Sequence, residues 1–121
     1  MNWKKLSNKQ ELNTLTKESF QGPVLIYKHS TRCSLSDITR SRLERSWKAD
    51  PLGLSPYFLD LVLNRDVSDA VEHQFQVRHQ SPQVLVIDQG KCIFQSSHLS
   101  ISHRALKDVA QAGAIQKSNW R

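Results

Sequence analysis

Short apolar runs separated by polar segments indicate an α/β protein built around a sheet. Continuous apolar stretches at residues 24–27, 57–63 and 83–87 predict strands that are buried on both faces. The turn sequence D-Q-G at 88–90 then predicts a hairpin that leads into a fourth strand at 92–94. The strand runs therefore supply the core of the fold, and the segments between them supply its outer layers.

Apolar residues at three- and four-residue spacing between these runs predict four helices. The expected helices cover about 8–18, 34–48, a segment from Ser68 or Asp69 to Phe75, and a segment from Ser100 or Ser102 to Gly113. The serines and the aspartate are expected as N-caps, and Gly113 is expected as a C-cap. Ser7 begins the sequence S-x-x-Q, which is typical of a capping box at the start of the first helix. Residues 116–121 are expected to form a frayed tail.

The resulting order of elements, α-β-α-β-α-β-β-α, is that of the thioredoxin fold. The first two strands are joined through a helix, so they are expected to be parallel, and the closing hairpin adds an antiparallel edge. We therefore predict a thioredoxin-like α/β fold with a central four-stranded mixed sheet flanked by helices. A length of 121 residues suits one domain, so residues 1–121 are expected to form a single thioredoxin-like domain.

The composition, with 38% hydrophobic and 23% charged residues, is that of a globular protein. No apolar run is long enough for a membrane span and no signal peptide is recognisable, so a cytosolic location without membrane association is expected. The net charge of +6 is concentrated in residues 1–50, which hold ten Lys or Arg against five Asp or Glu. The basic residues are scattered and no aromatic–basic motif accompanies them, so no nucleic-acid partner is expected.

The candidate chemistry lies in the sequence K-H-S-T-R-C-S-L-S at residues 28–36, where Cys33 follows the first buried strand and begins the second helix. A cysteine reacts as its thiolate, and the unpaired N–H groups at a helix N-terminus stabilise an anion. Arg32, Ser34 and Ser36 are expected to stabilise this thiolate through a positive charge, a backbone N–H and a hydroxyl. The polar surroundings favour a reactive Cys33 over a cysteine that only fills the core.

A single thiol is expected to carry the chemistry, because Ser36 stands where a dithiol motif has its second cysteine. The other cysteine, Cys92, follows the hairpin turn at the far end of the expected sheet, roughly 15 Å or more from Cys33. A disulfide needs Cα atoms within about 7 Å, so Cys92 is expected to be structural or idle. An external thiol must then resolve the mixed disulfide of Cys33.

Loops at the same end of the sheet supply candidate substrate contacts. Ser81 and Pro82 precede the third strand. In a thioredoxin-like topology their peptide bond is cis and places the Ser81 backbone beside Cys33, whereas a trans proline at the start of an edge strand is the alternative. His79 and His98 either contact an anionic thiol ligand or are polar loop residues. The substrate-binding candidates are His29, Thr31, His79, Ser81, Pro82 and His98.

Four segments carry a family resemblance: H-S-T-R-C-S-L-S, Y-F-L-D-L-V-L-N-R-D-V-S, V-R-H-Q-S-P-Q and S-H-L-S-I-S. Together, over about residues 3–112, the chain resembles the YtxJ-like monothiol bacilliredoxins, also called bacillithiol system redox-active proteins. The resemblance implies a thioredoxin-like fold with Cys33 as the active-site cysteine, Ser36 in place of a resolving thiol, and a cis-proline loop at 81–82. Ser34 departs from the family, which often has proline directly after the cysteine.

The resemblance also implies a function, that of a monothiol thiol–disulfide oxidoreductase. Such a protein removes a low-molecular-weight thiol, bacillithiol or a similar one, from mixed disulfides on cytosolic bacterial proteins. The expected partners are these S-thiolated proteins and the thiol, which acts as a co-substrate. No tightly bound cofactor is expected, and the histidine spacing predicts no metal site.

Two other functions were weighed against this one. The first is a non-enzymatic thioredoxin-like adaptor whose cysteine accepts a thiol cap as a stress sensor. The second is iron–sulfur carriage, as in monothiol glutaredoxins, which is disfavoured because the sequence C-S-L-S lacks the glycine and phenylalanine of their motif.

Overall fold

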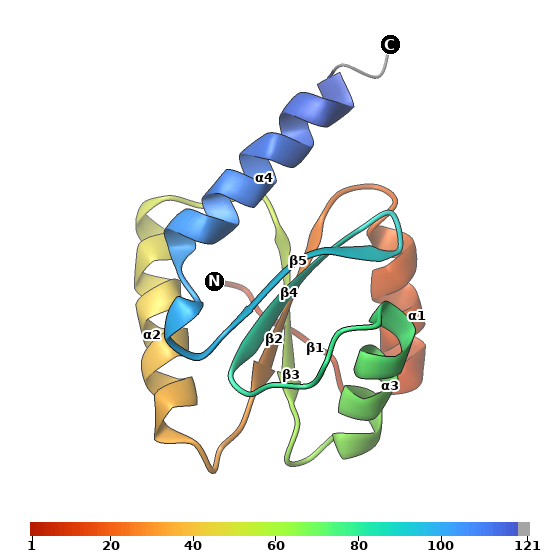
Figure 1. The fold of residues 1–121 in the computed structure, drawn as a ribbon, viewed down its shortest axis with the longest axis vertical. Coiled ribbons are helices and arrows are strands. Elements are labelled where there is room, and N and C mark those ends of the chain that lie inside the picture. The colour runs from red at the N-terminus through yellow and green to blue at the C-terminus, as the bar shows by residue number, and fades with distance from the viewer. Residues whose placement is uncertain (119–121) are drawn as a thin grey trace.

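The computed structural model describes residues 1–118, and within them a five-stranded mixed sheet is covered by helices on both faces (Figure 1). The elements along the chain are β1 (Lys4–Lys5), α1 (Lys9–Glu18), β2 (Val24–His29), α2 (Ser34–Ala49), β3 (Ser55–Asp60), α3 (Arg65–Phe75), β4 (Gln83–Asp88), β5 (Lys91–Ser97), the 3-10 turn η1 (His98–Ser100) and α4 (His103–Ser118). This order confirms the predicted alternation of strands and helices.

The sheet has the strand order β1-β3-β2-β4-β5, so the first long strand, β2, lies at its centre. β2 pairs in parallel with β3 and antiparallel with β4, and β4 pairs antiparallel with β5. The predicted mixture of parallel and antiparallel pairs is therefore confirmed. The fifth strand, β1, was not predicted, because it consists of two exposed lysines that carry no apolar pattern and that pair with β3 at the edge.

Two hydrophobic layers pack on the two faces of the sheet, and alternate residues of β2 contribute to each. The layer beneath α1 and α3 includes Leu12, Leu15, Val24, Ile26, Val67 and Val71. The layer beneath α2 and α4 includes Leu25, Tyr27, Leu43, Trp47 and Leu106. Figure 1 shows the same division, with α2 and α4 on one side of the sheet and α1 and α3 on the other. The alternation continues into the polar end of β2, where it sends the next two side chains to opposite faces.

The second buried strand and the third helix begin earlier than the sequence suggested. β3 ends at Asp60, whereas the apolar run predicted a strand as far as residue 63. The Asp60 carboxylate accepts the backbone N–H groups of Val62 and Leu63 at 3.1 and 3.3 Å, and this turns the chain out of the sheet. α3 then starts at once, with Asn64 in the N-cap position. The predicted caps at Ser68 or Asp69 are therefore wrong.

The last helix begins as predicted and ends later. The Ser102 hydroxyl accepts the Ala105 N–H at 3.1 Å, so Ser102 is the capping residue of the two that were considered. The predicted C-cap at Gly113 is wrong, because α4 continues to Ser118. A glycine inside a helix costs only about 1 kcal/mol relative to alanine, and alanines flank this one. The expected frayed tail thus begins no earlier than 119, and residues 119–121 lie outside the described part.

The described residues 1–118 contain the helices α1 to α4. None of them combines the length and the apolar character needed to cross a membrane.

The first helix is capped one residue later than predicted. The Asn8 side chain, and not that of Ser7, accepts the Glu11 N–H at 2.8 Å. Ser7 instead donates its hydroxyl and its backbone N–H to the Glu11 carboxylate at 2.7 and 2.9 Å. These hydrogen bonds lower the pKa of Glu11. The start of α1 is thus fixed on both sides of the third helical residue: the Glu11 N–H bonds the cap Asn8, and the Glu11 carboxylate bonds Ser7, which precedes the cap.

Replacing the cap should weaken the fold in a measurable way. Asn8→Ala removes the acceptor of the Glu11 N–H, and we expect the free energy of unfolding to fall by about 1 kcal/mol in urea titrations. Asn13→Ala is the matched control, since Asn13 is exposed in the same helix and alanine has the higher helix propensity. The control should be neutral or slightly stabilising, and an equal loss in both variants would contradict the cap assignment.

Candidate functional site

Cys33 stands at the N-terminus of α2, directly after the loop that leaves the central strand. It is the N-cap residue with an extended backbone, φ −120° and ψ 110°. Its N–H donates to the Ser30 carbonyl at 3.1 Å, and its own carbonyl accepts the Ser36 N–H at 3.0 Å. The side chain is partly exposed. Cys33 therefore stands at the N-terminus of a sixteen-residue helix, beside the N–H groups of its first turn.

The residues next to Cys33 in sequence are exposed around it. Thr31, Arg32 and Ser34 all have exposed side chains. The Arg32 N–H donates to the Ser30 hydroxyl at 3.3 Å, which shapes the loop while leaving the guanidinium free to face solvent. Ser34 is the first helical residue, so its N–H belongs to the unpaired first turn. Both residues are exposed beside Cys33, and their roles as thiolate-stabilising groups stay predictions.

Ser36 points into the protein rather than out of it. Its side chain is fully buried, and its hydroxyl lies 2.7 Å from Nδ1 of His29 while accepting the Ser30 N–H at 3.3 Å. The Tyr27 hydroxyl donates to the Ser36 carbonyl at 2.8 Å, and burial raises the pKa of Tyr27 to about 12. A hydroxyl carries one proton. Ser36 can therefore donate to the Cys33 thiolate only by giving up its bond to His29.

His29 lies beneath the site, which differs from its expected role as a surface contact for substrate. It is 3% exposed, and its ring packs 5.0 Å from the Phe58 ring. Burial lowers the pKa of His29, the Arg40 charge lowers it further, and the carboxylates of Asp37 and Asp60 partly oppose this. A neutral ring accepts the Ser36 proton at Nδ1 and carries its own hydrogen on Nε2, 3.6 Å from the Asp37 carboxylate. His29 thus ties the first turn of α2 to the end of β2.

The second predicted loop reaches the same end of the sheet. The Ser81–Pro82 peptide bond is cis. Pro82 directly precedes β4, whose first residue, Gln83, is paired with Lys28 near the end of β2. The Gln83 side chain bonds the backbone on both sides of His79, at the Arg78 carbonyl and the Gln80 N–H. The Gln83 side chain therefore fixes the loop before Pro82, which lies at the same end of the sheet as the loop that follows β2 and carries Cys33.

His98 is attached to this loop through its backbone. Its N–H donates to the Pro82 carbonyl at 2.9 Å, and its φ of 54° lies in the left-handed region. The ring is exposed. His98 thus lies at the end of the sheet where the sequence predicted it. Its exposed ring is compatible with either predicted role, contact with a thiol ligand or a polar loop residue, and both stay predictions.

His79 is anchored by a buried lysine. Lys28 is fully buried on the α3 side of the sheet, and its Nζ lies 3.2 Å from Nδ1 of His79. The Ser68 hydroxyl lies 3.3 Å from the same nitrogen, and the Glu72 carboxylate accepts the His79 backbone N–H. Burial lowers the pKa of Lys28 to about 8, and the charges of Glu72 and Asp69 partly oppose this. Lys28 therefore supports the loop before Pro82 and does not face the thiol.

Cys92 lies at the opposite end of the sheet from Cys33. Cys92 is paired with Ile87, which is paired with Val24 at the start of β2. The five residue steps along β2 from Val24 to His29 span roughly 17 Å, and His29 is the last strand residue before the loop that carries Cys33. Cys92 therefore lies about one strand length away from that loop. The Cys92 thiol donates to the Phe94 carbonyl at 3.2 Å, and burial raises its pKa. Both cysteines are free.

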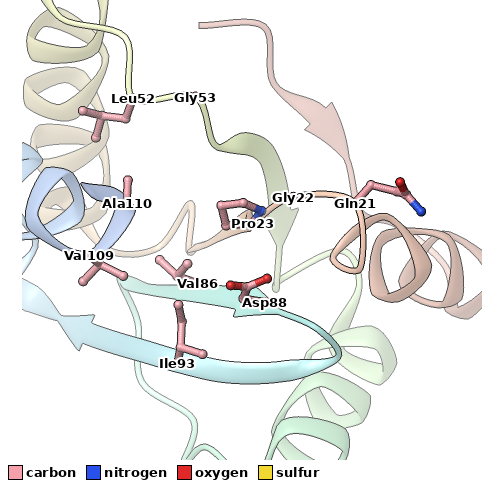
Figure 2. A pocket seen from close by; sticks show the side chains of 10 residues that line it. All are labelled: Gln21, Gly22, Pro23, Leu52, Gly53, Val86, Asp88, Ile93, Val109 and Ala110. Carbon is pink, nitrogen blue, oxygen red and sulfur yellow. The ribbon is translucent and has the colours of Figure 1, made fainter. Parts of the chain in front are cut away.

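A cavity of about 250 Å³ also lies at this opposite end (Figure 2). Its lining includes Pro23, which precedes β2, and Asp88, which ends β4, together with apolar side chains from α4 and β5 such as Val109 and Ile93. Because it sits by the start of β2, it is separated from Cys33 by the length of the sheet. It does not belong to the thiol site.

A smaller cavity adjoins the Cys33 loop itself. It has a volume of about 240 Å³ and is lined by Ser30, Arg32, Leu61, Val62 and Arg65. Sequence reasoning missed Arg65. The signal that could have found it is the parallel pairing of β2 and β3, which brings the segments after both strands to one edge.

Comparisons with known proteins agree with this geometry. A family model described as "Monothiol bacilliredoxin BrxC" matches residues 4–106. A solved structure described as a candidate oxidoreductase with a thioredoxin fold is 25% identical, with a TM-score of 0.72 over 90% of this chain and 91% of that chain. Thioredoxin from Fasciola hepatica is 16% identical, with a TM-score of 0.69 over 90% and 97% of the two chains. The N21Q mutant thioredoxin from Halobacterium salinarum NRC-1 is 17% identical, with a TM-score of 0.68 over 89% and 87%. The thioredoxin fold is thereby confirmed.

Removing the buried hydroxyl should destabilise the site. Ser36→Ala leaves Nδ1 of His29 and the Ser30 N–H without their partner, and we expect the free energy of unfolding to fall by about 2 kcal/mol. Ser34→Ala, one half-turn away and exposed, should change it by about 0.5 kcal/mol or less. Urea unfolding of both variants tests this, and equal losses would show that the His29 contact contributes nothing special.

The buried lysine should give stability a distinctive pH dependence. Its pKa is about 8 in the folded protein against an ordinary 10.5, so between these values the unfolded chain binds more protons at Lys28. The wild type should therefore gain stability relative to Lys28→Met as pH rises from 8 to 10.5, by about 3 kcal/mol at most. Lys48→Met, at an exposed lysine of α2, should differ from the wild type by a constant amount. A constant difference for Lys28→Met as well would mean that burial does not disfavour the charge.

Proposed function

The chain belongs to the monothiol bacilliredoxin family, and from this we propose that it is a monothiol thiol–disulfide oxidoreductase acting on mixed disulfides between cytosolic proteins and a low-molecular-weight thiol such as bacillithiol. The observation that carries the proposal is the position of one partly exposed thiol at the N-terminus of α2, with a buried serine in the place of a second thiol. The co-substrate is the small thiol, and no tightly bound cofactor is needed.

The reaction has two thiol–disulfide exchange steps. The Cys33 thiolate attacks the sulfur of the small thiol in the mixed disulfide, the bond to the client protein breaks, and the client cysteine leaves as a thiolate that takes up a proton. Cys33 then carries the small thiol in a disulfide. A second molecule of small thiol attacks this disulfide, releases the Cys33 thiolate and departs as the oxidised small-thiol disulfide. Over both steps, the mixed disulfide and one free small thiol give the client thiol and the small-thiol disulfide, so one S–S bond replaces another and the single proton of the free thiol passes to the client.

An external thiol is required because the protein offers no internal one. The Ser36 hydroxyl forms no disulfide, and Cys92 is at the other end of the sheet with its thiol turned to a backbone carbonyl. Burial raises the pKa of Cys92, which further reduces its thiolate fraction at neutral pH. These features support release of Cys33 by a thiol from solution.

The surroundings of Cys33 supply the other parts of the proposed mechanism. The unpaired N–H groups of the first turn of α2, including that of Ser34, stabilise the attacking and the leaving thiolate. The backbone of Ser81 can pair with a bound peptide or thiol. Thr31, His79 and His98 are candidate contacts at the rim, and Arg32 contributes positive charge.

The central prediction is a covalent adduct on one cysteine. Incubation of the wild-type protein with oxidised bacillithiol should increase its mass by one thiol unit, because one exchange step stops at the Cys33 mixed disulfide. Intact-protein mass spectrometry should show the same adduct on Cys92→Ser and none on Cys33→Ser. An adduct that persists in Cys33→Ser, or no adduct on the wild type, would refute the proposal.

Turnover separates the enzyme from an adaptor. A client protein carrying bacillithiol in a mixed disulfide should be reduced by catalytic amounts of the protein when free bacillithiol is present. Formation of the adduct without release of client thiol would instead favour a thioredoxin-like adaptor that only accepts a thiol cap.

A further inference from the structure

Two segments that follow parallel strands meet beside the catalytic loop and enclose a small cavity. β2 and β3 run in parallel with His29 opposite Asp60, so the residues after each strand leave the sheet at the same edge. The Leu61 N–H donates to the His29 carbonyl at 3.0 Å and joins the two segments. The cavity between them measures about 240 Å³, and we call it the arginine cleft after Arg32 and Arg65 in its lining.

The two arginines of this cleft come from different segments, and neither forms an ion pair within residues 1–118. Both side chains are exposed. Arg40, by contrast, binds the carboxylates of its helix neighbours Asp37 and Glu44 at 3.2 and 3.4 Å. The cleft therefore presents two guanidinium groups whose positive charges no described carboxylate neutralises.

Acidic side chains lie near the cleft, but within residues 1–118 none of them forms an ion pair with Arg32 or Arg65. The Asp60 carboxylate, at the end of β3, already accepts the N–H groups of Val62 and Leu63. The Asp37 carboxylate, in the first turn of α2, is bound by Arg40 and faces His29. Hydrogen bonds from N–H groups leave the charge of Asp60 in place, and Asp66 and Asp69 follow Arg65 in α3. What distinguishes the cleft is that no described carboxylate is paired with either of its two guanidinium groups.

The cleft lies within reach of a group bonded to the catalytic sulfur. Cys33 directly follows the lining residue Arg32, and its N–H donates to the carbonyl of Ser30, which also lines the cleft. A small molecule in disulfide linkage with Cys33 is therefore attached one residue after Arg32, to the loop that borders the cleft. Guanidinium groups bind carboxylates in paired, charge-assisted hydrogen bonds, and lysine does not replace them in that geometry.

We propose that the arginine cleft binds the carboxylate groups of the small thiol while that thiol is bonded to Cys33. This inference rests on the proposed thiol exchange and adds the residues of the chain that recognise the co-substrate, Arg32 and Arg65. The volume suits the tail of a small molecule. Arg65 is thereby a binding residue for the acidic tail, and it acts in both exchange steps because the tail is present in both.

The test compares an acidic with a neutral probe. The probes are the disulfide of mercaptosuccinate, which has two carboxylates on each thiol, and the disulfide of 2-mercaptoethanol, which has no charge. Quenched samples at low salt give the second-order rate of adduct formation on Cys33 by mass spectrometry, and the ratio of the two rates defines the selectivity. We expect Arg65→Gln to lower the selectivity about tenfold, as for the loss of one charge-assisted hydrogen-bonded contact.

The control removes an arginine that is far from the cleft. Arg45→Gln deletes the same charge from an exposed position of α2, about 18 Å along the helix axis from Cys33. Its selectivity should stay within about twofold of the wild type. Arg65→Lys should recover part of the lost selectivity because the charge remains, and this also shows that Arg65 variants still fold.

Each outcome decides between the two proposals. Equal selectivity in the wild type and Arg65→Gln would overturn the cleft while the thiol exchange stands. An equal slowing with both probes would also overturn it, because Arg65 would then act on the thiolate and not on the acidic tail. Absence of any adduct on the wild type with either probe would overturn the thiol exchange and the cleft together. A third probe, a neutral thiol linked to an acidic peptide, would overturn the assignment to the small thiol if it alone lost rate in Arg65→Gln.

Discussion

The hydrogen bond between Ser36 and His29 determines where the thiol of this protein stands. It joins the first turn of α2 to the last residue of the central strand across 2.7 Å, in a fully buried setting. The Ser30 N–H and the Tyr27 hydroxyl also bind Ser36. Three hydrogen bonds therefore attach the first turn of α2, which follows Cys33, to β2 and to the loop after it. A dithiol protein would use this position for its second sulfur. Here the position holds the helix in place, and the exposed chemistry is left to one cysteine.

Two polar side chains are buried at the end of β2, and each of them forms hydrogen bonds that support a loop at this end of the sheet. Lys28 and His29 are consecutive strand residues, so their side chains face opposite layers, the first toward α3 and the second toward α2. Each supports one loop of the site: His29 supports the cysteine loop and Lys28 the loop before Pro82. Burial lowers the pKa of both groups. Burying these two groups costs some stability, and their hydrogen bonds add to those that Gln83 and Glu72 make to the loop before Pro82 and that Ser36 makes to the cysteine loop.

The sequence predicted the parts of this arrangement that depend on local pattern. Apolar runs indicated β2 and β4, and the break in pattern after β2 indicated the position of Cys33 at a helix start. It did not predict β1, whose two lysines pair only because β3 offers an open edge. The N-cap at Asn64 was missed because Ser68 is an equally common capping type four residues on, and it lies buried inside the helix instead. The Ser36–His29 bond and the approach of Arg65 arise from tertiary contacts that no spacing rule describes.

A one-thiol exchange places a particular demand on recognition. A dithiol protein meets the small thiol once at most, because its own second sulfur completes the reaction. A monothiol protein must accept the small thiol first as part of the mixed disulfide and again as the attacking reductant. The feature common to both steps is the thiol tail next to Cys33, whereas the client protein is present only in the first. Under the proposed exchange, a group that contacts the tail beside Cys33 takes part in both halves of the reaction, whereas a surface that contacts the client takes part only in the first. This is the physical reason for proposing a small-thiol site at the arginine cleft next to Cys33.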